Sequence, residues 1–211
     1  MTRAQRAARL RGIYAIVNEG ERNVVAIAQA AYENGVRVVQ YRAKAGIIHE
    51  NVRAIRKLAE KHEALLIMND DWQAAVALDC DGVHLGPDDT GFLDAAPVRA
   101  LLRERLIGLS CGTRAEAERA DAMDIDYLGV GAVFATASKA DAGAPIGIDG
   151  LLQVANATRL PVAAIGGITV QNLPLVRGSG VAMAALIAAI TGAADPAIAA
   201  RELVAAWNAE A

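Results

Sequence analysis

Eight short apolar segments alternate with eight helix-like segments along the 211-residue chain, and this alternation predicts an α/β fold with a parallel sheet. Eight such units suit a (β/α)8 TIM barrel. A doubly wound open sheet is the alternative, but no Gly-x-Gly-x-x-Gly motif follows the first expected strand. Apolar residues make up 54% of the chain and aromatic residues only 4%, so alanine and aliphatic side chains are expected to build the core. No linker interrupts the pattern, and residues 1–211 are expected to form a single barrel domain.

The expected strands are short apolar runs, and they span residues 13–17, 37–41, 65–68, 82–85, 106–109, 127–130, 161–165 and 181–184. The expected helices have apolar residues at helical spacing, as Val52, Ile55 and Ala59 do in the second helix. Gly35 follows the first helix, where a glycine commonly ends one. These helices span residues 23–33, 50–62, 71–79, 93–103, 115–123, 151–157, 170–176 and 196–207.

The net charge of −3 argues against binding to nucleic acids or to a membrane surface. The two cysteines, Cys80 and Cys111, form neither a CxxC pair nor a disulfide framework, so a reducing, cytoplasmic location is expected. No apolar run reaches the 18 residues of a membrane span. Residues 1–11 contain three arginines, and we interpret them as a short extra helix before the first strand in preference to a transit peptide. The sequence leaves open whether the chain forms a homo-oligomer.

Two aspartates, Asp70 and Asp89, follow the third and fourth expected strands. Neighbouring parallel strands are about 4.8 Å apart, so the two carboxylates are expected to lie close together. Two such charges about 4 Å apart repel by roughly 4 kcal/mol at an effective dielectric of 20. A cation between them would relieve that repulsion, and oxygen ligands suit Mg²⁺. The alternative for Asp70 alone is an N-cap of the following helix.

In a barrel of this kind the active site lies at the carboxyl ends of the strands. The polar residues expected there include three cations and the aspartate pair, and they are Gln40, Arg42, Lys44, Asn69, Asp70, Asp89, Ser110, Thr136, Ser138 and Lys139. This set suits a diphosphate with Mg²⁺, while Gly166-Gly167 and the backbone after the eighth strand suit a second phosphate. Two phosphorylated small molecules that become joined are therefore the expected substrates. His84, on the fourth strand, is expected to be a hydrogen-bonded core histidine.

The segment of residues 135–148 has the length of a lid or a disordered loop, and Lys139 favours the lid. We expect it to be mobile in the empty protein and to exclude water when closed.

Several segments resemble motifs of the thiamine phosphate synthase (thiamine-phosphate pyrophosphorylase) family. QYRAK at 40–44 is similar to Gln-Leu-Arg-Glu-Lys, and MND with DGVHLGPDD resembles Asn-Asp and Gly-Val-His-Leu-Gly-Gln-x-Asp. YLGVGAVFATASK resembles Tyr-x-Gly-x-Gly-x-x-Phe-Pro-Thr-x-Thr-Lys, and PVAAIGGI is similar to Pro-Val-x-Ala-Ile-Gly-Gly-Ile. The matches occur in the family's order over nearly the whole chain. QxRxK, ND, GxDD and SK together form a specific signature.

The resemblance implies a Mg²⁺-dependent transferase that couples 4-amino-2-methyl-5-(diphosphooxymethyl)pyrimidine to a thiazole phosphate and releases diphosphate. It implies that the pyrimidine diphosphate is held by Gln40, Arg42, Lys44, Asn69, Ser110 and Lys139, of which Arg42, Lys44 and Lys139 would be catalytic. It places Mg²⁺ on Asp70 and Asp89. The thiazole phosphate would be held by Thr136, Ser138, Gly167 and the Ala184-Ala185 backbone.

The chain departs from the family pattern mainly on the thiazole side. Ala135 replaces a proline, Ser138 a threonine and Ala185 a serine, and the 167–181 segment is shorter than expected; Pro87 replaces a glutamine elsewhere. Two other functions therefore stay open. One is a thiazole tautomerase-like isomerase, which resembles the synthase but uses a histidine just after the fifth strand, where this chain has Ser110-Cys111-Gly112. The other is a non-catalytic binding paralogue of the same pathway.

Overall fold

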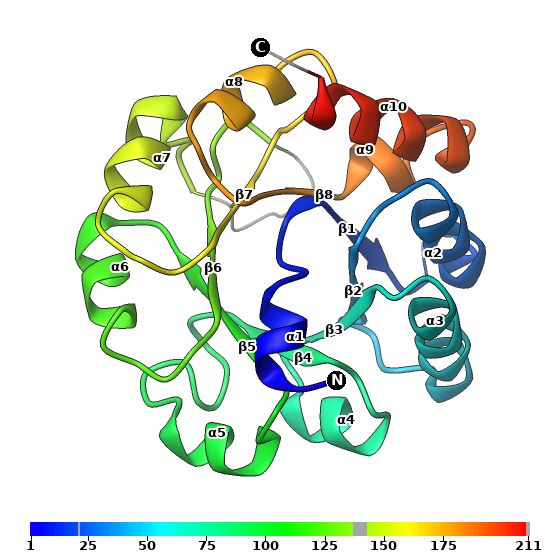
Figure 1. Cartoon of the computed structure of the whole chain (residues 1–211), viewed down its shortest axis with the longest axis horizontal. Coiled ribbons are helices and arrows are strands. Elements are labelled where there is room, and N and C mark those ends of the chain that lie inside the picture. Colours follow the sequence, from blue (N-terminus) through cyan, green and yellow to red (C-terminus); the bar gives the residue numbers. More distant parts are fainter. Residues whose placement is uncertain (21, 137–142, 210–211) are drawn as a thin grey trace.

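The computed structural model describes residues 1–20, 22–136 and 143–209, and its centre is a closed barrel of eight parallel strands (Figure 1). Each strand pairs with the next one in the sequence, and β8 pairs with β1, which closes the barrel. The strands are β1 (Gly12–Asn18), β2 (Val38–Arg42), β3 (Leu65–Asn69), β4 (Gly82–Leu85), β5 (Leu106–Cys111), β6 (Tyr127–Val130), β7 (Val162–Ile165) and β8 (Met183–Leu186). The predicted TIM barrel is confirmed, and the open-sheet alternative is wrong.

The helices form a ring outside the barrel, apart from α1 (Arg3–Ala7) (Figure 1). They are α2 (Val24–Glu33), α3 (His49–Lys61), α4 (Trp72–Ala77), α5 (Ala96–Leu102), α6 (Arg114–Ala120), α7 (Gly147–Ala155), α8 (Leu173–Gly178), α9 (Ala188–Thr191) and α10 (Pro196–Asn208). Within the described ranges, the helices are all too short or too polar to cross a lipid bilayer.

Three predicted helices begin three or more residues away from the predicted start. Helices α5 and α8 begin three residues later than predicted, because Pro97 and Pro174 occupy the first turn, where a missing backbone N–H costs nothing. Helix α7 begins four residues earlier than predicted, at Gly147, whose φ of 67° is a backbone conformation that glycine adopts readily. Helix α9 was not predicted, because four residues are too few for a periodic pattern.

Alternate residues of each strand face the two sides of the barrel wall. The inner side contributes a compact core that includes Tyr14, Val38, Ile67, Tyr127 and Met183. The outer side packs against the helices through a larger apolar layer rich in alanine, valine and leucine. The interior is therefore filled with side chains, and a substrate can bind only at an end of the barrel.

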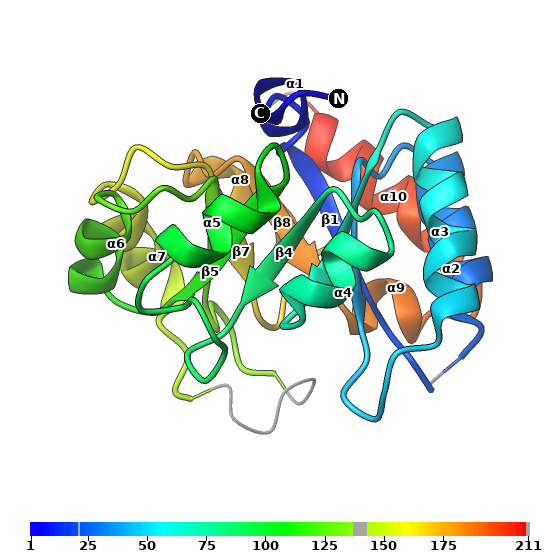
Figure 2. The same ribbon diagram turned by 90° about the horizontal axis from the view of Figure 1, so that it is seen from below.

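Helix α1 closes the amino end of the barrel (Figure 2). Arg6 Nε donates to Asp81 Oδ1 over 2.9 Å, and Arg3 Nε donates to Asp126 Oδ1 over 2.6 Å. Both aspartates directly precede strands, β4 and β6, and both are buried. The predicted short extra helix is confirmed, and its arginines serve the fold. Within the described residues, no helix covers the opposite, carboxyl end of the barrel in the way that α1 covers the amino end.

Candidate active site

Strand β2 brings a glutamine and an arginine to the inner face of the barrel mouth. Gln40 is buried, and its Nε2 donates to the hydroxyl of Tyr14 over 2.8 Å. Arg42 Nη1 donates to Asn18 Oδ1 at the end of β1 over 3.1 Å. Alternation along the strand puts both side chains on one face. Arg42 is thus oriented at the mouth while part of its guanidinium remains available to an anion.

The two predicted carboxylates meet next to a lysine. Lys44 Nζ lies 2.6 Å from Asp70 Oδ2, and Asp89 Oδ2 accepts a hydrogen bond from Gly86 N over 2.6 Å. Burial raises the pKa of Asp89, the carboxyl group of Asp70 within hydrogen-bonding reach raises it further, and the Gly86 N–H and Lys44 oppose the rise. The predicted proximity of Asp70 and Asp89 is therefore confirmed. The N-cap of α4 is Asp71, whose Oδ1 accepts from Ala74 N, so the N-cap interpretation of Asp70 is wrong.

The carboxylate pair suits a cation that takes most of its ligands from substrate phosphates and water. No group of three or more His, Cys, Asp or Glu side chains that could hold a metal occurs within residues 1–20, 22–136 and 143–209. Mg²⁺ commonly binds through one or two carboxylates together with substrate phosphates and water. Two adjacent carboxylates beside Lys44, with Arg42 at the same mouth, match that pattern, because the cations would hold the same phosphates.

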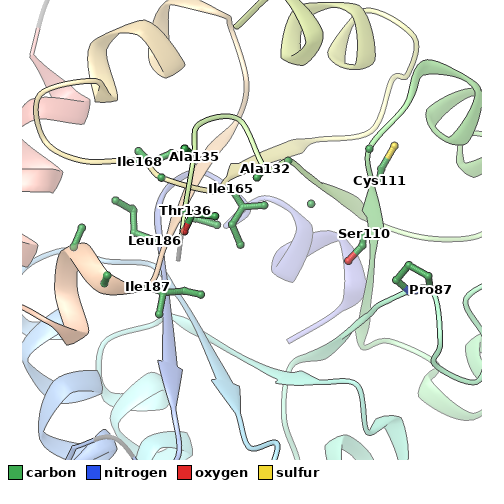
Figure 3. A pocket seen from close by; sticks show the side chains of 18 of the residues that line it. Pro87, Ser110, Cys111, Ala132, Ala135, Thr136, Ile165, Ile168, Leu186 and Ile187 are labelled. Atoms are coloured by element: carbon green, nitrogen blue, oxygen red, sulfur yellow. The ribbon is translucent and has the colours of Figure 1, made fainter. Parts of the chain in front are cut away.

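A pocket of about 780 Å³ occupies the other half of the mouth, at the ends of β5 to β8 (Figure 3). Figure 3 shows Thr136 beside Ile165, Leu186 and Ile187, with Ser110 across the pocket. Gly167 and Ala185 also line it. Ala184 belongs to the outer apolar layer, so only its backbone could reach a ligand. Gln40, Arg42, Lys44 and the aspartate pair lie outside this lining, whereas Ser110 belongs to it.

The turn after β7 needs its two glycines. Gly166 and Gly167 have φ values of 103° and 62°, which side chains disfavour. A Cβ at Gly166 would lie 2.6 Å from Ala132 Cα, and one at Gly167 would lie 2.4 Å from the carbonyl oxygen of Ala135. The chain after β7 therefore lies tightly against residues 132–135. With the short helix α9 after β8, this turn forms the phosphate-binding arrangement common in barrels of this type.

Two residues predicted for the site, Ser138 and Lys139, fall outside the described residues. Most of the first half of the predicted 135–148 lid does so too. Asn69 ends β3 beside Asp70, in register with His84. Cys111 lines the pocket, but burial raises the pKa of its thiol to about 11, so it is protonated near neutral pH and unsuited to act as a nucleophile.

The sequence did not predict what surrounds His84. Its Nε2 lies 3.2 Å from Ser110 Oγ, and its Nδ1 lies 3.2 Å from the hydroxyl of Tyr127. The prediction that His84 is hydrogen-bonded is confirmed, but its side chain is half-buried and does not belong to the buried core, and its contact with a site residue was not predicted. The contact could have been predicted only from the knowledge that His84, Ser110 and Tyr127 all point into the barrel from the adjacent strands β4, β5 and β6.

Fold and site define a class: a (β/α)8 barrel with cations and paired carboxylates on one side of its mouth and a glycine-rich phosphate turn on the other. Such a protein binds phosphorylated small molecules. The family model described as thiamine monophosphate synthase matches residues 13–190, and the chain belongs to this family. The resemblance stated from the motifs is thereby confirmed.

Individual relatives agree with the family match. The chain is 41% identical to the thiamine-phosphate synthase of Moorella thermoacetica over 87% of this chain and 88% of that protein. It is 42% identical to that of Anaeromyxobacter dehalogenans, over 98% and 92% of the two chains. Among solved structures, thiamine phosphate pyrophosphorylase from Pyrococcus furiosus superposes with a TM-score of 0.86 at 31% identity, covering 97% of each chain.

Proposed function

We propose that the protein is a thiamine-phosphate synthase. It joins 4-amino-2-methyl-5-(diphosphooxymethyl)pyrimidine to a thiazole phosphate, forming thiamine phosphate and diphosphate. One observation carries the proposal: the Asp70–Asp89 pair with Lys44 lies on one side of the barrel mouth, and the pocket closed by Gly166-Gly167 lies on the other. A metal-assisted diphosphate site next to a backbone phosphate site is what this coupling needs.

The pyrimidine diphosphate is assigned to the β2–β4 side of the mouth. Arg42 and Lys44 supply positive charge to its phosphates, joined by Gln40, Asn69, Ser110 and Lys139. Asp70 and Asp89 would hold Mg²⁺, which when bound would neutralise charge on the departing diphosphate. Because Lys44 and Asp70 are paired in the ligand-free protein, Lys44 is positioned to turn from the carboxylate to a phosphate when a cation takes over that carboxylate.

The thiazole phosphate is assigned to the β7–β8 side. The structure corrects one predicted part of this site: Ala184 and Ala185 lie within β8 and pair with β1 and β7, so their backbone N–H groups are engaged in the sheet. The backbone N–H groups assigned to the phosphate are those of Gly167 and of the residues after β8, 187–189, which line the pocket. They bind phosphate without a side-chain hydroxyl, so Ala185 in place of a serine does not abolish the site. Thr136 and Ser138 add hydroxyl groups. The apolar side chains of Ile165, Leu186 and Ile187 suit the flat thiazole ring.

The chemistry needs charge stabilisation and positioning more than it needs a base. Loss of diphosphate leaves a pyrimidinyl-methyl cation, and the thiazole nitrogen uses its lone pair to form the new carbon–nitrogen bond. Arg42, Lys44 and Lys139 stabilise the leaving diphosphate, while the pocket aligns the thiazole. None of the three histidines has to remove a proton. The two free, buried cysteines support a cytoplasmic location.

The test mixes both phosphorylated halves with purified protein, with and without Mg²⁺, and follows products by chromatography. Thiamine phosphate that forms only with the metal is expected. Formation at the same rate without any divalent cation would contradict the metal assignment. Isomerisation of the thiazole phosphate alone would indicate the tautomerase-like alternative, and binding of both halves without product would indicate the non-catalytic one.

A further inference from the structure

A continuous line of hydrogen bonds crosses the interior of the barrel between two residues of the proposed site. It begins at Gln40, whose Nε2 donates to Tyr14 over 2.8 Å. The hydroxyls of Tyr14 and Tyr127 lie 3.0 Å apart, and that of Tyr127 lies 3.2 Å from His84 Nδ1. His84 Nε2 lies 3.2 Å from Ser110 Oγ, which faces the pocket. The line thus joins β2, β1, β6, β4 and β5.

The barrel interior provides space for this line through two glycines. A Cβ at Gly108 would lie 2.1 Å from Cζ of Tyr127, and a Cβ at Gly129 would lie 2.7 Å from Cε1 of His84. Both glycines sit at inward positions of β5 and β6, where other strands place bulky side chains. The rings of Tyr127 and His84 therefore occupy the space that side chains at positions 108 and 129 would fill. Such matched space indicates a specific arrangement of the rings.

The hydrogen bonds have one direction in which every proton finds an acceptor. Gln40 donates to Tyr14, Tyr14 to Tyr127, Tyr127 to His84 Nδ1, and His84 Nε2–H to Ser110. The reverse direction leaves the Tyr14 proton without an acceptor within the line. Burial raises the pKa of both tyrosines, so the hydroxyls keep their protons. In the forward direction Ser110 Oγ accepts a hydrogen bond from His84 Nε2–H, and the hydroxyl proton of Ser110 is free to point into the pocket.

We propose that Tyr14, Tyr127 and His84 are positioning residues that hold the Ser110 hydroxyl as a hydrogen-bond donor toward the diphosphate of the pyrimidine substrate. The inference rests on the proposed function for the identity of that substrate. An anionic phosphate oxygen accepts such a bond strongly, and a fixed donor loses no rotational freedom on binding. The line also fixes the amide of Gln40 at its other end.

The first test reads the direction of the line without any activity measurement. Nitrogen NMR on the ligand-free protein, with His84 assigned by comparison with the H84N variant, should find the neutral ring protonated on Nε2. A ring protonated on Nδ1 alone would overturn the proposal, because Ser110 would then donate to the histidine and not to a ligand. The measurement itself is made on the unmodified protein and does not depend on whether the tyrosine variants fold.

The second test compares two buried tyrosines that differ in what they contact. Tyr127→Phe keeps the ring but removes the hydroxyl that contacts His84, so the KM for the pyrimidine diphosphate should rise about tenfold. The KM for the thiazole phosphate should change less than twofold. Tyr32→Phe is the matched control, because the Tyr32 hydroxyl donates to Leu65 O on the helix side of the barrel. It should lower the melting temperature and leave both KM values unchanged.

The third test asks whether Tyr127 acts through Ser110. In a Ser110→Ala background, Tyr127→Phe should add less than a twofold change, since the group that it positions is gone. A further tenfold rise of the KM for the pyrimidine diphosphate in the Ser110→Ala background would overturn the proposal. Equal KM changes from Tyr127→Phe and Tyr32→Phe would also overturn it. Failure of the proposed function looks different, because the unmodified protein would then form no thiamine phosphate, and the NMR result would still decide the direction of the line.

Discussion

Asp88 and Asp89 are neighbours in the sequence with different surroundings. Asp88 is exposed, whereas Asp89 is half-buried beside Asp70, which raises its pKa above the ordinary value of 3.8. The folded chain therefore binds the Asp89 proton more tightly than the unfolded chain. Stability falls as pH rises from that value through the folded pKa, and the cost is fully present at neutral pH.

Asp89→Asn should accordingly raise the melting temperature of the metal-free protein at pH 7 by about 1 °C, while severely weakening Mg²⁺-dependent turnover. The gain should vanish as pH falls below the ordinary value of 3.8, where Asp89 is protonated in both the folded and the unfolded chain. Thermal melts across this pH range and Mg²⁺ titrations of the rate would measure both effects. Asp88→Asn is the control, and equal losses of Mg²⁺ use in the two variants would contradict the metal assignment.

Arg42 and Arg37 allow a similar comparison at the two ends of one strand. Arg42 lies at the carboxyl end of β2, while the exposed Arg37 precedes β2 and donates to His62 O. Arg42→Ala should lower kcat/KM for the pyrimidine diphosphate about 100-fold and leave the circular dichroism spectrum unchanged, because Arg42 is proposed to stabilise the diphosphate and its hydrogen bond to Asn18 lies at the barrel mouth. Arg37→Ala should leave kcat/KM unaltered. Loss of folded protein in Arg42→Ala would assign that arginine to the fold.

The sequence could predict some of these contacts and not others. Asp70 and Asp89 follow adjacent parallel strands, so strand order alone brings them together. The contact of His84 with Ser110 depends on the stagger of β4 against β5, with His84 opposite Gly108, and on the empty space at Gly129. Stagger between strands is a property of the closed sheet, which no short stretch of sequence expresses.

At the level of elements, strands were predicted more accurately than helices. The bounds of β4 and β6 agree with the prediction, because charged or small residues delimit these runs sharply. Helix starts depend on the first-turn chemistry of residues such as Pro97 and Pro174, which periodicity ignores. The short α9 escaped prediction although, in barrels of this type, such a helix helps to form the phosphate site.

The turn after β7 yields a prediction for the thiazole side. Gly167→Ala would force residues 134–135 away and displace the phosphate-binding backbone, so the KM for the thiazole phosphate should rise about tenfold while the KM for the pyrimidine diphosphate stays constant. Gly180→Ala is the matched control. Gly180 also has a positive φ, 77°, but a Cβ there meets nothing within 4 Å, and it precedes β8 at the amino end of the barrel.

Steady-state kinetics and melting curves on both glycine variants would separate the two effects. Each should lose about 1 kcal/mol of stability from the unfavourable backbone conformation, and Gly167→Ala should lose more because its Cβ also displaces residues 134–135. Only Gly167→Ala should change binding of the thiazole phosphate. An equal change in both KM values would show that the variant distorts the whole mouth.

The molecule as a whole divides its charges between the two ends of the barrel. The amino end contains ion pairs that are satisfied within the protein, such as Arg6 with the fully buried Asp81. The carboxyl end contains cations and carboxylates that also suit external ligands. Stability and ligand binding should therefore respond to different sets of charge substitutions.

Arg6→Ala tests this division. It leaves the buried Asp81 carboxylate without its closest cation, with Arg56 Nη1 3.9 Å away, and should cost about 3–5 kcal/mol of unfolding free energy. Arg11→Ala, a change at an exposed arginine just before β1, should cost less than about 0.5 kcal/mol. Urea unfolding would measure both. Per folded molecule, kcat and both KM values should match the unmodified protein, and a selective loss of substrate binding would contradict the division.

The space at Gly108 has a consequence for how this barrel can change over generations. A single nucleotide substitution can convert glycine to alanine, yet the added methyl group would overlap the ring of Tyr127. Such a mutation can persist only after Tyr127 has been replaced by a residue with a smaller side chain. Positions 108 and 127 should therefore vary together among descendants of this protein, and a side chain at 108 should accompany the loss of the tyrosine.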